Sequence, residues 1–161
     1  MGLGNLTRWS HPTWHLFHGM AEQISEEYFN KNRKEVLDLY SSICNSLPCP
    51  YCRKHAMMYI KRNRIDKIKT KKELKNYLYI FHNSVSKRSK GKIEGEEVLE
   101  KYKMMNVEVA LLIFLKQFFQ PYYVHHNFTS WMRNELKEKL NKYFEKNWGK
   151  MFIGIRNPYK N

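Results

Sequence analysis

The sequence predicts an all-α fold. Apolar residues recur at intervals of three and four along most of the chain, which is the period of a helix with one buried face. The 161 residues include only five prolines and seven glycines, whereas aromatic residues make up 15%. No segment alternates apolar and polar residues as a half-buried strand does. We therefore expect a folded, helix-rich chain with a sizeable core.

The first two helices are predicted from a cap and from two apolar stripes. Ser10 is a candidate N-cap, with Pro12 just inside the helix, and an apolar stripe follows over residues 14–24. After a polar break at residues 26–32, a second stripe covers residues 36–47.

The next three helices are each expected to begin at a recognisable signal. The third should run from Cys49 to about residue 62. Thr70 and Glu73 form a capping box that starts a fourth helix, whose apolar face reaches Val85. A short fifth helix is expected over residues 96–103.

Residues 104–161 are predicted to be a helical extension of a domain formed by residues 1–103. Residues 107–119 are apolar nearly all round, which indicates a buried helix that ends at Pro121. Asn127 or Thr129 is expected to cap a last amphipathic helix, and residues 157–161 are expected to fray. The apolar face of that helix comprises Trp131, Met132, Leu136, Leu140 and Phe144.

Cys49 and Cys52 form the most informative chemical motif. Residues i and i+3 in the first turn of a helix lie within the Cα separation of a disulfide, and Pro50 suits that turn. The helix dipole favours a thiolate there, as do Arg53 and Lys54. The motif therefore indicates a redox-active dithiol.

Two other interpretations of these cysteines stay open at this point. Cys49, Cys52 and His55 provide three zinc ligands, but no second C-x-x-C or H-x3-H pair completes a set of four. Two buried, inert cysteines are the other alternative, which the neighbouring prolines and charges disfavour. The third cysteine, Cys44, lies on an apolar stripe and is expected to be a buried thiol.

Charge and hydropathy limit the classes of protein that remain. The formal net charge of +14 attracts phosphates, nucleic acids and anionic lipids without selecting among them. The first residues lack the apolar segment of a signal peptide, and residues 107–119 are too few to span a membrane. We expect a soluble intracellular protein, in which a dithiol is more often catalytic than structural.

Three motifs follow one another along the predicted helices. They are W-x3-H at Trp14 and His18, C-x-x-C at residues 49–52, and H-N-x-V at residues 82–85. Together they resemble the Erv/ALR family of FAD-linked sulfhydryl oxidases, most closely the short forms encoded by large DNA viruses. The resemblance covers about residues 9–103. It implies a four-helix bundle with a short fifth helix that binds FAD.

The resemblance also implies a role for each residue. Cys49 and Cys52 would be the catalytic pair: Cys52 would lie beside the flavin, and Cys49 would exchange disulfides with the substrate. In the basic stretch 87–92, Lys92 is the preferred pyrophosphate ligand. Ser86 replaces an asparagine that is frequent in the family. The implied FAD-binding residues are Trp14, His18, Cys52, His55, His82, Asn83, Val85, Ser86, Lys92 and Tyr102.

The implied activity passes electrons from a dithiol protein through the Cys49–Cys52 pair and FAD to O2, giving H2O2. The chain has no second C-x-x-C, so we expect a thioredoxin-like or other dithiol partner to deliver electrons directly rather than through Cys44. A homodimer is expected, with residues 104–161 as an interface or packing extension. A docking surface for a thioredoxin-like partner is the alternative use of these residues. For a viral protein, the expected location is the host cytoplasm or the virion.

Two other function classes stay open. A flavin-free thiol–disulfide exchanger is one, since C-P-Y-C also occurs in glutaredoxin-like proteins, but these need a βαβ unit and no strand is predicted. A basic module that binds nucleic acid through its charge is the other. It leaves the C-x-x-C motif unexplained, so nucleic acid is not the expected partner.

Overall fold

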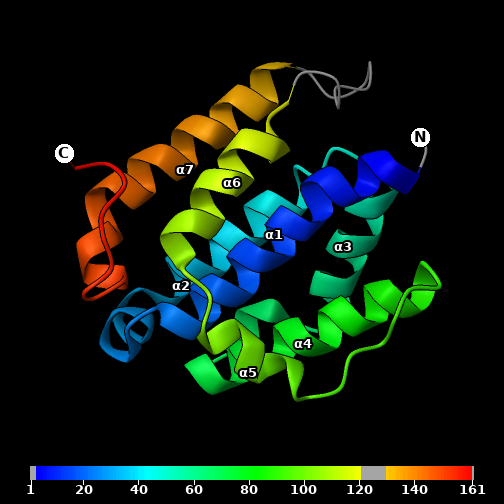
Figure 1. The fold of residues 1–161 in the computed structure, drawn as a ribbon, viewed down its shortest axis with the longest axis horizontal. Coiled ribbons are helices and arrows are strands. Elements are labelled where there is room, and N and C mark those ends of the chain that lie inside the picture. Colours follow the sequence, from blue (N-terminus) through cyan, green and yellow to red (C-terminus); the bar gives the residue numbers. More distant parts are fainter. Residues whose placement is uncertain (1–2, 121–129, 161) are drawn as a thin grey trace.

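The computed structural model describes residues 3–120 and 130–160. Within these ranges the chain forms helices and no strand, which confirms the predicted all-α fold (Figure 1). None of the described helices is long and apolar enough to span a membrane. The elements in order are α1 (Leu3–Gln23), α2 (Glu26–Cys44), α3 (Pro50–Arg62), the 3-10 helix η1 (Ile65–Lys67), α4 (Lys71–Arg88), α5 (Val98–Lys103), α6 (Val107–Phe118) and α7 (Ser130–Met151).

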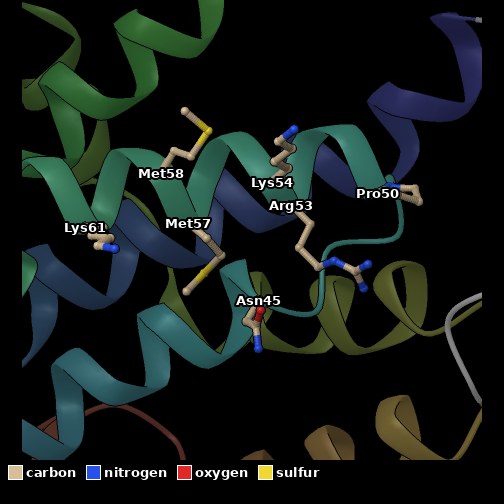
Figure 2. Close-up of a pocket in the computed structure, with 7 residues that line it drawn as sticks. All are labelled: Asn45, Pro50, Arg53, Lys54, Met57, Met58 and Lys61. Atoms are coloured by element: carbon tan, nitrogen blue, oxygen red, sulfur yellow. The ribbon is translucent and has the colours of Figure 1, made fainter.

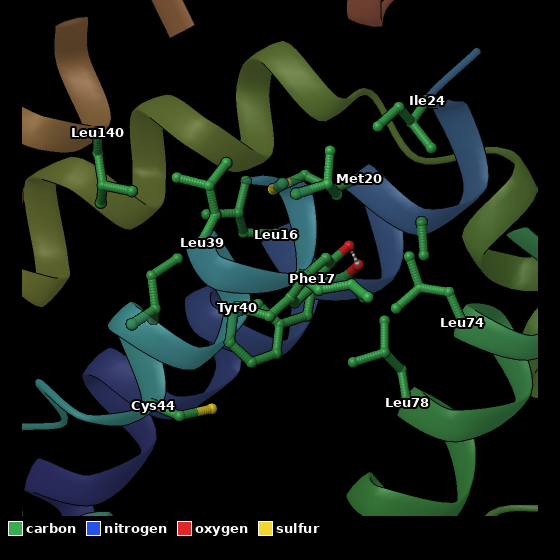
Figure 3. Packing of buried hydrophobic residues seen from close by; sticks show 14 of the residues in the cluster. Leu16, Phe17, Met20, Ile24, Leu39, Tyr40, Cys44, Leu74, Leu78 and Leu140 are labelled. Carbon is green, nitrogen blue, oxygen red and sulfur yellow. Dashed lines mark hydrogen bonds between the residues drawn. The ribbon is translucent and has the colours of Figure 1, made fainter. Parts of the chain in front are cut away.

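The long helix α1 organises the core. It packs against α4, α5 and α6, whereas α2 packs against α3 and α7 (Figure 1). Phe17 of α1 and Tyr40 of α2 meet in the middle, and the Tyr40 hydroxyl donates a hydrogen bond of 3.1 Å to the Phe17 carbonyl. Leu74 and Leu78 of α4 approach the same centre (Figure 3). The predicted bundle of four helices with a short fifth thus forms around one apolar core.

The predicted start of the first helix is wrong. No cap forms at Ser10, because α1 begins at Leu3 and contains Pro12 in its interior. Trp9 is buried and packs edge-on against Phe118 of α6. This contact holds the turn before Pro12 in the helix, and the signal for it lies more than a hundred residues away in the sequence.

The predicted polar break before the second stripe is also wrong. Ser25 caps α2, since its hydroxyl accepts the N–H of Tyr28 at 3.1 Å. Tyr28 and Phe29 are buried, so residues 26–32 belong to the helix. The interruption is limited to non-helical dihedral angles at Asn32.

In the extension formed by residues 104–161, helix α6 is less buried than predicted. One face of α6 packs on α1, but Val109, Leu112 and Ile113 on its other face are 49%, 45% and 46% exposed. The prediction of a helix buried all round is therefore wrong, because the described helices cover only one of its faces. The predicted stop at Pro121 lies outside the described residues.

In α7 the apolar face is only partly as predicted. Leu136, Leu140 and Phe144 are buried, whereas Trp131 and Met132 are exposed near the start of the helix. The candidate caps at residues 127 and 129 lie outside the described residues. The following segment does not fray as a whole, because the Tyr159 hydroxyl donates to the Asn141 side chain at 3.0 Å.

Candidate active site

A disulfide joins Cys49 and Cys52 at the start of α3, with their Cα atoms 5.2 Å apart. Cys49 is the N-cap, Pro50 follows it in the first turn, and the Cys49 sulfur accepts the N–H of Cys52 at 3.1 Å. Both cysteines are partly exposed. The predicted helix start is therefore confirmed. After reduction, the same N–H and the helix dipole would stabilise a thiolate at Cys49.

His55 faces a cation rather than a metal site. The Arg88 guanidinium, at the end of α4, contacts Nε2 of His55 and donates to the Tyr51 hydroxyl at 2.9 Å. Desolvation, and then the positive charge of Arg88, lower the pKa of His55. Within the described residues, no group of three or more His, Cys, Asp or Glu side chains could hold a metal ion. Arg88 thus brings a cation from the predicted phosphate-binding stretch to the turn that carries the disulfide.

Four of the predicted cofactor-binding side chains form one aromatic stack between α1, α4 and α5. The rings of Trp14 and His82 lie 4.1 Å apart and nearly parallel, and those of His18 and Tyr102 lie 4.0 Å apart. The Nε2 atom of His18 and the Nδ1 atom of His82 are 3.2 Å apart and share a hydrogen bond. Residues far apart in the sequence therefore meet between these helices, and their binding of FAD stays a prediction.

Both histidines of this stack are neutral at pH 7. Burial lowers the pKa of His18 to about 3, with a smaller contribution from His82. Burial also lowers the pKa of His82 to about 4. The rings stack on one another here, and uncharged aromatic rings of this kind also stack on planar heterocycles such as a flavin or an adenine.

An aromatic bridge connects the stack to the helix of the disulfide. Tyr59 of α3 stacks on Phe81 of α4 at 4.3 Å, and Phe81 contacts Trp14 edge-on at 5.2 Å. The sequence interpretation missed Tyr59. The signal was its position two turns after Cys52, on the same face of one helix.

Tyr77 lies beside the aromatic bridge. Its ring packs edge-on against Tyr59, and its hydroxyl is buried without a hydrogen-bond partner among the described residues. Nε1 of Trp9 and of Trp148 are unpaired in the same way, so this hydroxyl alone does not indicate a ligand. The features that suit FAD are the neutral aromatic rings and the cationic Arg88.

The remaining predicted nucleotide ligands do not join the stack. Asn83 uses its amide on the loop before α5: it donates to the carbonyl of Glu94 at 2.8 Å and accepts the N–H of Glu94 at 3.0 Å. Lys92 is 80% exposed and pairs with the Glu94 carboxylate at 3.1 Å. Val85 packs on the core, and the Ser86 carbonyl accepts the Gly91 N–H at 2.8 Å. Their contacts with a nucleotide stay a prediction.

Cys44 lies apart from this chemistry. It is a free, buried cysteine on α2, and burial raises its pKa to about 12. This agrees with the interpretation as a buried thiol.

Comparison with known proteins identifies the family. The model of the Erv1/Alr family matches residues 11–106, which contain the three motifs and end before α6. The chain belongs to the Erv1/Alr family. This membership confirms the resemblance inferred from the motifs.

Viral proteins are among the relatives of this Erv1/Alr protein. An FAD-linked sulfhydryl oxidase of African swine fever virus (isolate Pig/Kenya/KEN-50/1950) is 28% identical over 88 residues, covering 55% of this chain and 73% of the relative. A provisionally named FAD-linked sulfhydryl oxidase of invertebrate iridescent virus 3 is 26% identical over 98 residues, covering 60% and 66%. No solved structure matches the chain.

Proposed function

We propose that this Erv1/Alr protein is an FAD-linked thiol oxidase of the viral type, which forms disulfide bonds in partner proteins. The observation that supports this most directly is the partly exposed Cys49–Cys52 disulfide on a helix that an aromatic bridge links to the neutral stack. Family membership supports the same activity.

The chain's own cysteines carry out the exchange. A substrate thiolate attacks the Cys49 sulfur, which breaks the Cys49–Cys52 bond and releases Cys52 as a thiolate. A second substrate thiolate then attacks the substrate sulfur of the mixed disulfide and releases Cys49. The substrate is oxidised to a disulfide, and the enzyme pair is reduced to two thiols. When bound, FAD supplies an acceptor for these two electrons and passes them to O2, giving H2O2.

Trp14, His18, His82 and Tyr102 are proposed to hold the ring systems of FAD. Their neutral rings stack on one another and can stack on the planar rings of a cofactor in the same way. Arg88 and the lysines of stretch 87–92 are proposed to neutralise the pyrophosphate. Asn83 is proposed to act indirectly, since it fixes the loop at Glu94.

The substrate protein and the location of the oxidase are also part of this proposal. The reducing substrate is a thioredoxin-like or other dithiol protein, and the location is the cytoplasm of an infected host or the virion. The homodimer stays a prediction, for which Val109, Leu112 and Ile113 of α6 offer an exposed apolar face.

The decisive experiment is an absorbance spectrum of the purified protein, followed by oxygen uptake with dithiothreitol. We expect a flavin spectrum that bleaches with excess dithiol and returns with O2. Cys52→Ser should abolish turnover and keep FAD bound, and Cys49→Ser should block electron delivery from bulky substrates. A folded protein that stays colourless when FAD is added would contradict the proposal.

Oxygen uptake and a nucleic-acid binding assay separate the proposed oxidase from the two alternative functions. A flavin-free exchanger would consume dithiol only in proportion to its own disulfide and would take up no O2. A basic nucleic-acid-binding module would bind nucleic acid in a salt-dependent way that survives Cys49→Ser and Cys52→Ser.

A further inference from the structure

An open groove of about 550 Å³ lies along α3 (Figure 2). It begins at Pro50, the residue directly after Cys49, and ends at Lys61. The lining residues of α3 follow Pro50 by three, four, seven, eight and eleven positions, so they form one stripe of the helix. Asn45, the residue directly after α2, completes the lining (Figure 2).

The middle of the groove is apolar and adaptable. Met57 is partly buried and packs on the core, while Met58 is 38% exposed. Methionine side chains are unbranched and polarisable, so they accommodate apolar side chains of different shapes. This stripe lies roughly a third of a turn around α3 from buried Ala56 and Ile60. Lys54, Met58 and Lys61 offer contact area at the surface, whereas Met57 also packs on the core.

The rim of the groove is cationic. Arg53, Lys54 and Lys61 line it, and none of its lining residues is acidic. A concave surface lined by one sign of charge concentrates ligands of the opposite sign and accelerates their association. The charge and the methionines together fit a segment that is acidic and also carries an apolar side chain.

The length of the groove fits a short extended segment. Eleven steps along a helix from Pro50 to Lys61 correspond to roughly 16 Å, which about five residues of extended chain span. A segment of this length, anchored on the methionines, reaches the Cys49 end of α3 where Pro50 is exposed.

We propose that this groove binds an acidic segment that flanks the reactive cysteine of the substrate protein. The inference rests on the proposed oxidase function and names the class of its substrate. A segment docked in the groove is held at the start of α3, and its cysteine reaches the Cys49 sulfur around the first turn of that helix, where the exchange described above begins.

The test compares three substrates of the FAD-loaded protein by oxygen uptake. These are dithiothreitol and two dithiol peptides of equal length and equal apolar content, one acidic and one basic outside the cysteines. At low salt we expect kcat/KM to be about tenfold higher for the acidic peptide, and this preference to shrink in high salt. Met58→Gln should lower kcat/KM for both peptides and leave dithiothreitol oxidation unchanged.

A matched pair of charge reversals separates the groove from the overall charge. Lys61→Glu should remove most of the preference for the acidic peptide. Lys142→Glu changes the net charge equally on α7, where the lysine side chain is 80% exposed, and should preserve the preference. Both variants should oxidise dithiothreitol as the unmodified protein does.

Each outcome decides the inference. Equal kcat/KM for the two peptides at low salt, or equal effects of the two charge reversals, would overturn docking in the groove while dithiothreitol oxidation upholds the oxidase. Failure of the FAD-loaded protein to oxidise any of the three substrates would overturn both.

Discussion

Environment, rather than residue type, separates the three cysteines. Cys49 and Cys52 are partly exposed at a helix start, where N–H groups and the dipole favour a thiolate. Cys44 is buried, and its raised pKa of about 12 keeps it protonated. A thiol that is neither ionised nor accessible is a poor nucleophile, so Cys44 is unsuited to shuttle electrons.

Replacement of this buried thiol should affect stability and not turnover. We expect Cys44→Ala to lower the free energy of unfolding by about 1 kcal/mol, because a small cavity replaces the sulfur. Dithiothreitol oxidation should stay within twofold of the unmodified protein, a margin of about 0.4 kcal/mol in the barrier. Urea unfolding and oxygen uptake measure the two effects. Loss of turnover in a folded Cys44→Ala protein would instead assign Cys44 a redox role.

The two neutral histidines of the stack make stability depend on pH. Burial holds the pKa of His18 at about 3 and that of His82 at about 4, below the ordinary value of 6.5. In mild acid the unfolded chain therefore binds more protons than the folded chain. Their contribution is fully present above pH 6.5. It is lost as the pH falls towards 4 for His82 and towards 3 for His18.

We therefore expect the melting temperature to fall between pH 7 and pH 5. His18→Phe keeps a ring beside Tyr102 and removes one titrating group, so its melting temperature should fall less over the same interval. Differential scanning calorimetry of both proteins at the two pH values measures this. An equally large fall in the variant would show that His18 does not titrate on unfolding.

At the scale of elements, capping side chains fix where several helices begin. Thr70 accepts the Glu73 N–H at 3.1 Å, and the Glu73 carboxylate accepts the Lys69 N–H at 2.6 Å, close to the predicted capping box. Asn106 caps α6 in a similar way: its side-chain oxygen accepts two N–H groups, those of Glu108 and Val109. Both caps act within four residues, which is why local sequence patterns reveal such starts.

Removal of the α6 cap should destabilise the fold without removing any apolar contact. We expect Asn106→Ala to lower the free energy of unfolding by about 1 kcal/mol, because two N–H groups lose their acceptor. Asn106→Asp keeps the acceptor and should restore most of this loss. Urea denaturation of the three proteins tests it, and equal stability of the alanine and aspartate variants would refute it.

At the scale of the whole molecule, an ion pair joins the C-terminal segment to α6. Glu108 is buried on α6, and its carboxylate accepts hydrogen bonds from the guanidinium of Arg156, with the Arg156 Nε atom 2.8 Å away. A buried carboxylate needs such a partner, because desolvation of an unpaired charge is costly. The segment after α7 is therefore held against the helix that covers α1.

Replacement of Arg156 should destabilise the fold more when the Glu108 carboxylate is present than when it has been removed. We expect Arg156→Met to lower the denaturation midpoint, and the double variant with Glu108→Gln to recover part of the loss, because the unpaired charge is gone. A double-mutant cycle by urea denaturation gives the coupling between the two residues. Additive effects would show that the pair contributes nothing jointly.

The sequence by itself determined the helical class, the start of α3 at Cys49, the capping box at Thr70 and the set of motifs that revealed the family. These features depend on residues a few positions apart, since caps, helical periods and C-x-x-C spacing are local. The motifs also named four residues that lie together in the structure, in the stack of Trp14 with His82 and His18 with Tyr102, while their binding of FAD stays a prediction.

Only the tertiary structure decided which faces are covered and what each polar group contacts. The helix α1 begins before the predicted cap at Ser10, and Trp9 in its first turns packs against Phe118 of α6. Val109, Leu112 and Ile113 are exposed because no helix among the described residues covers them. Asn83 hydrogen-bonds to the backbone of Glu94, eleven residues later in the chain. Burial and hydrogen-bond choice depend on segments distant in sequence, which no local pattern encodes.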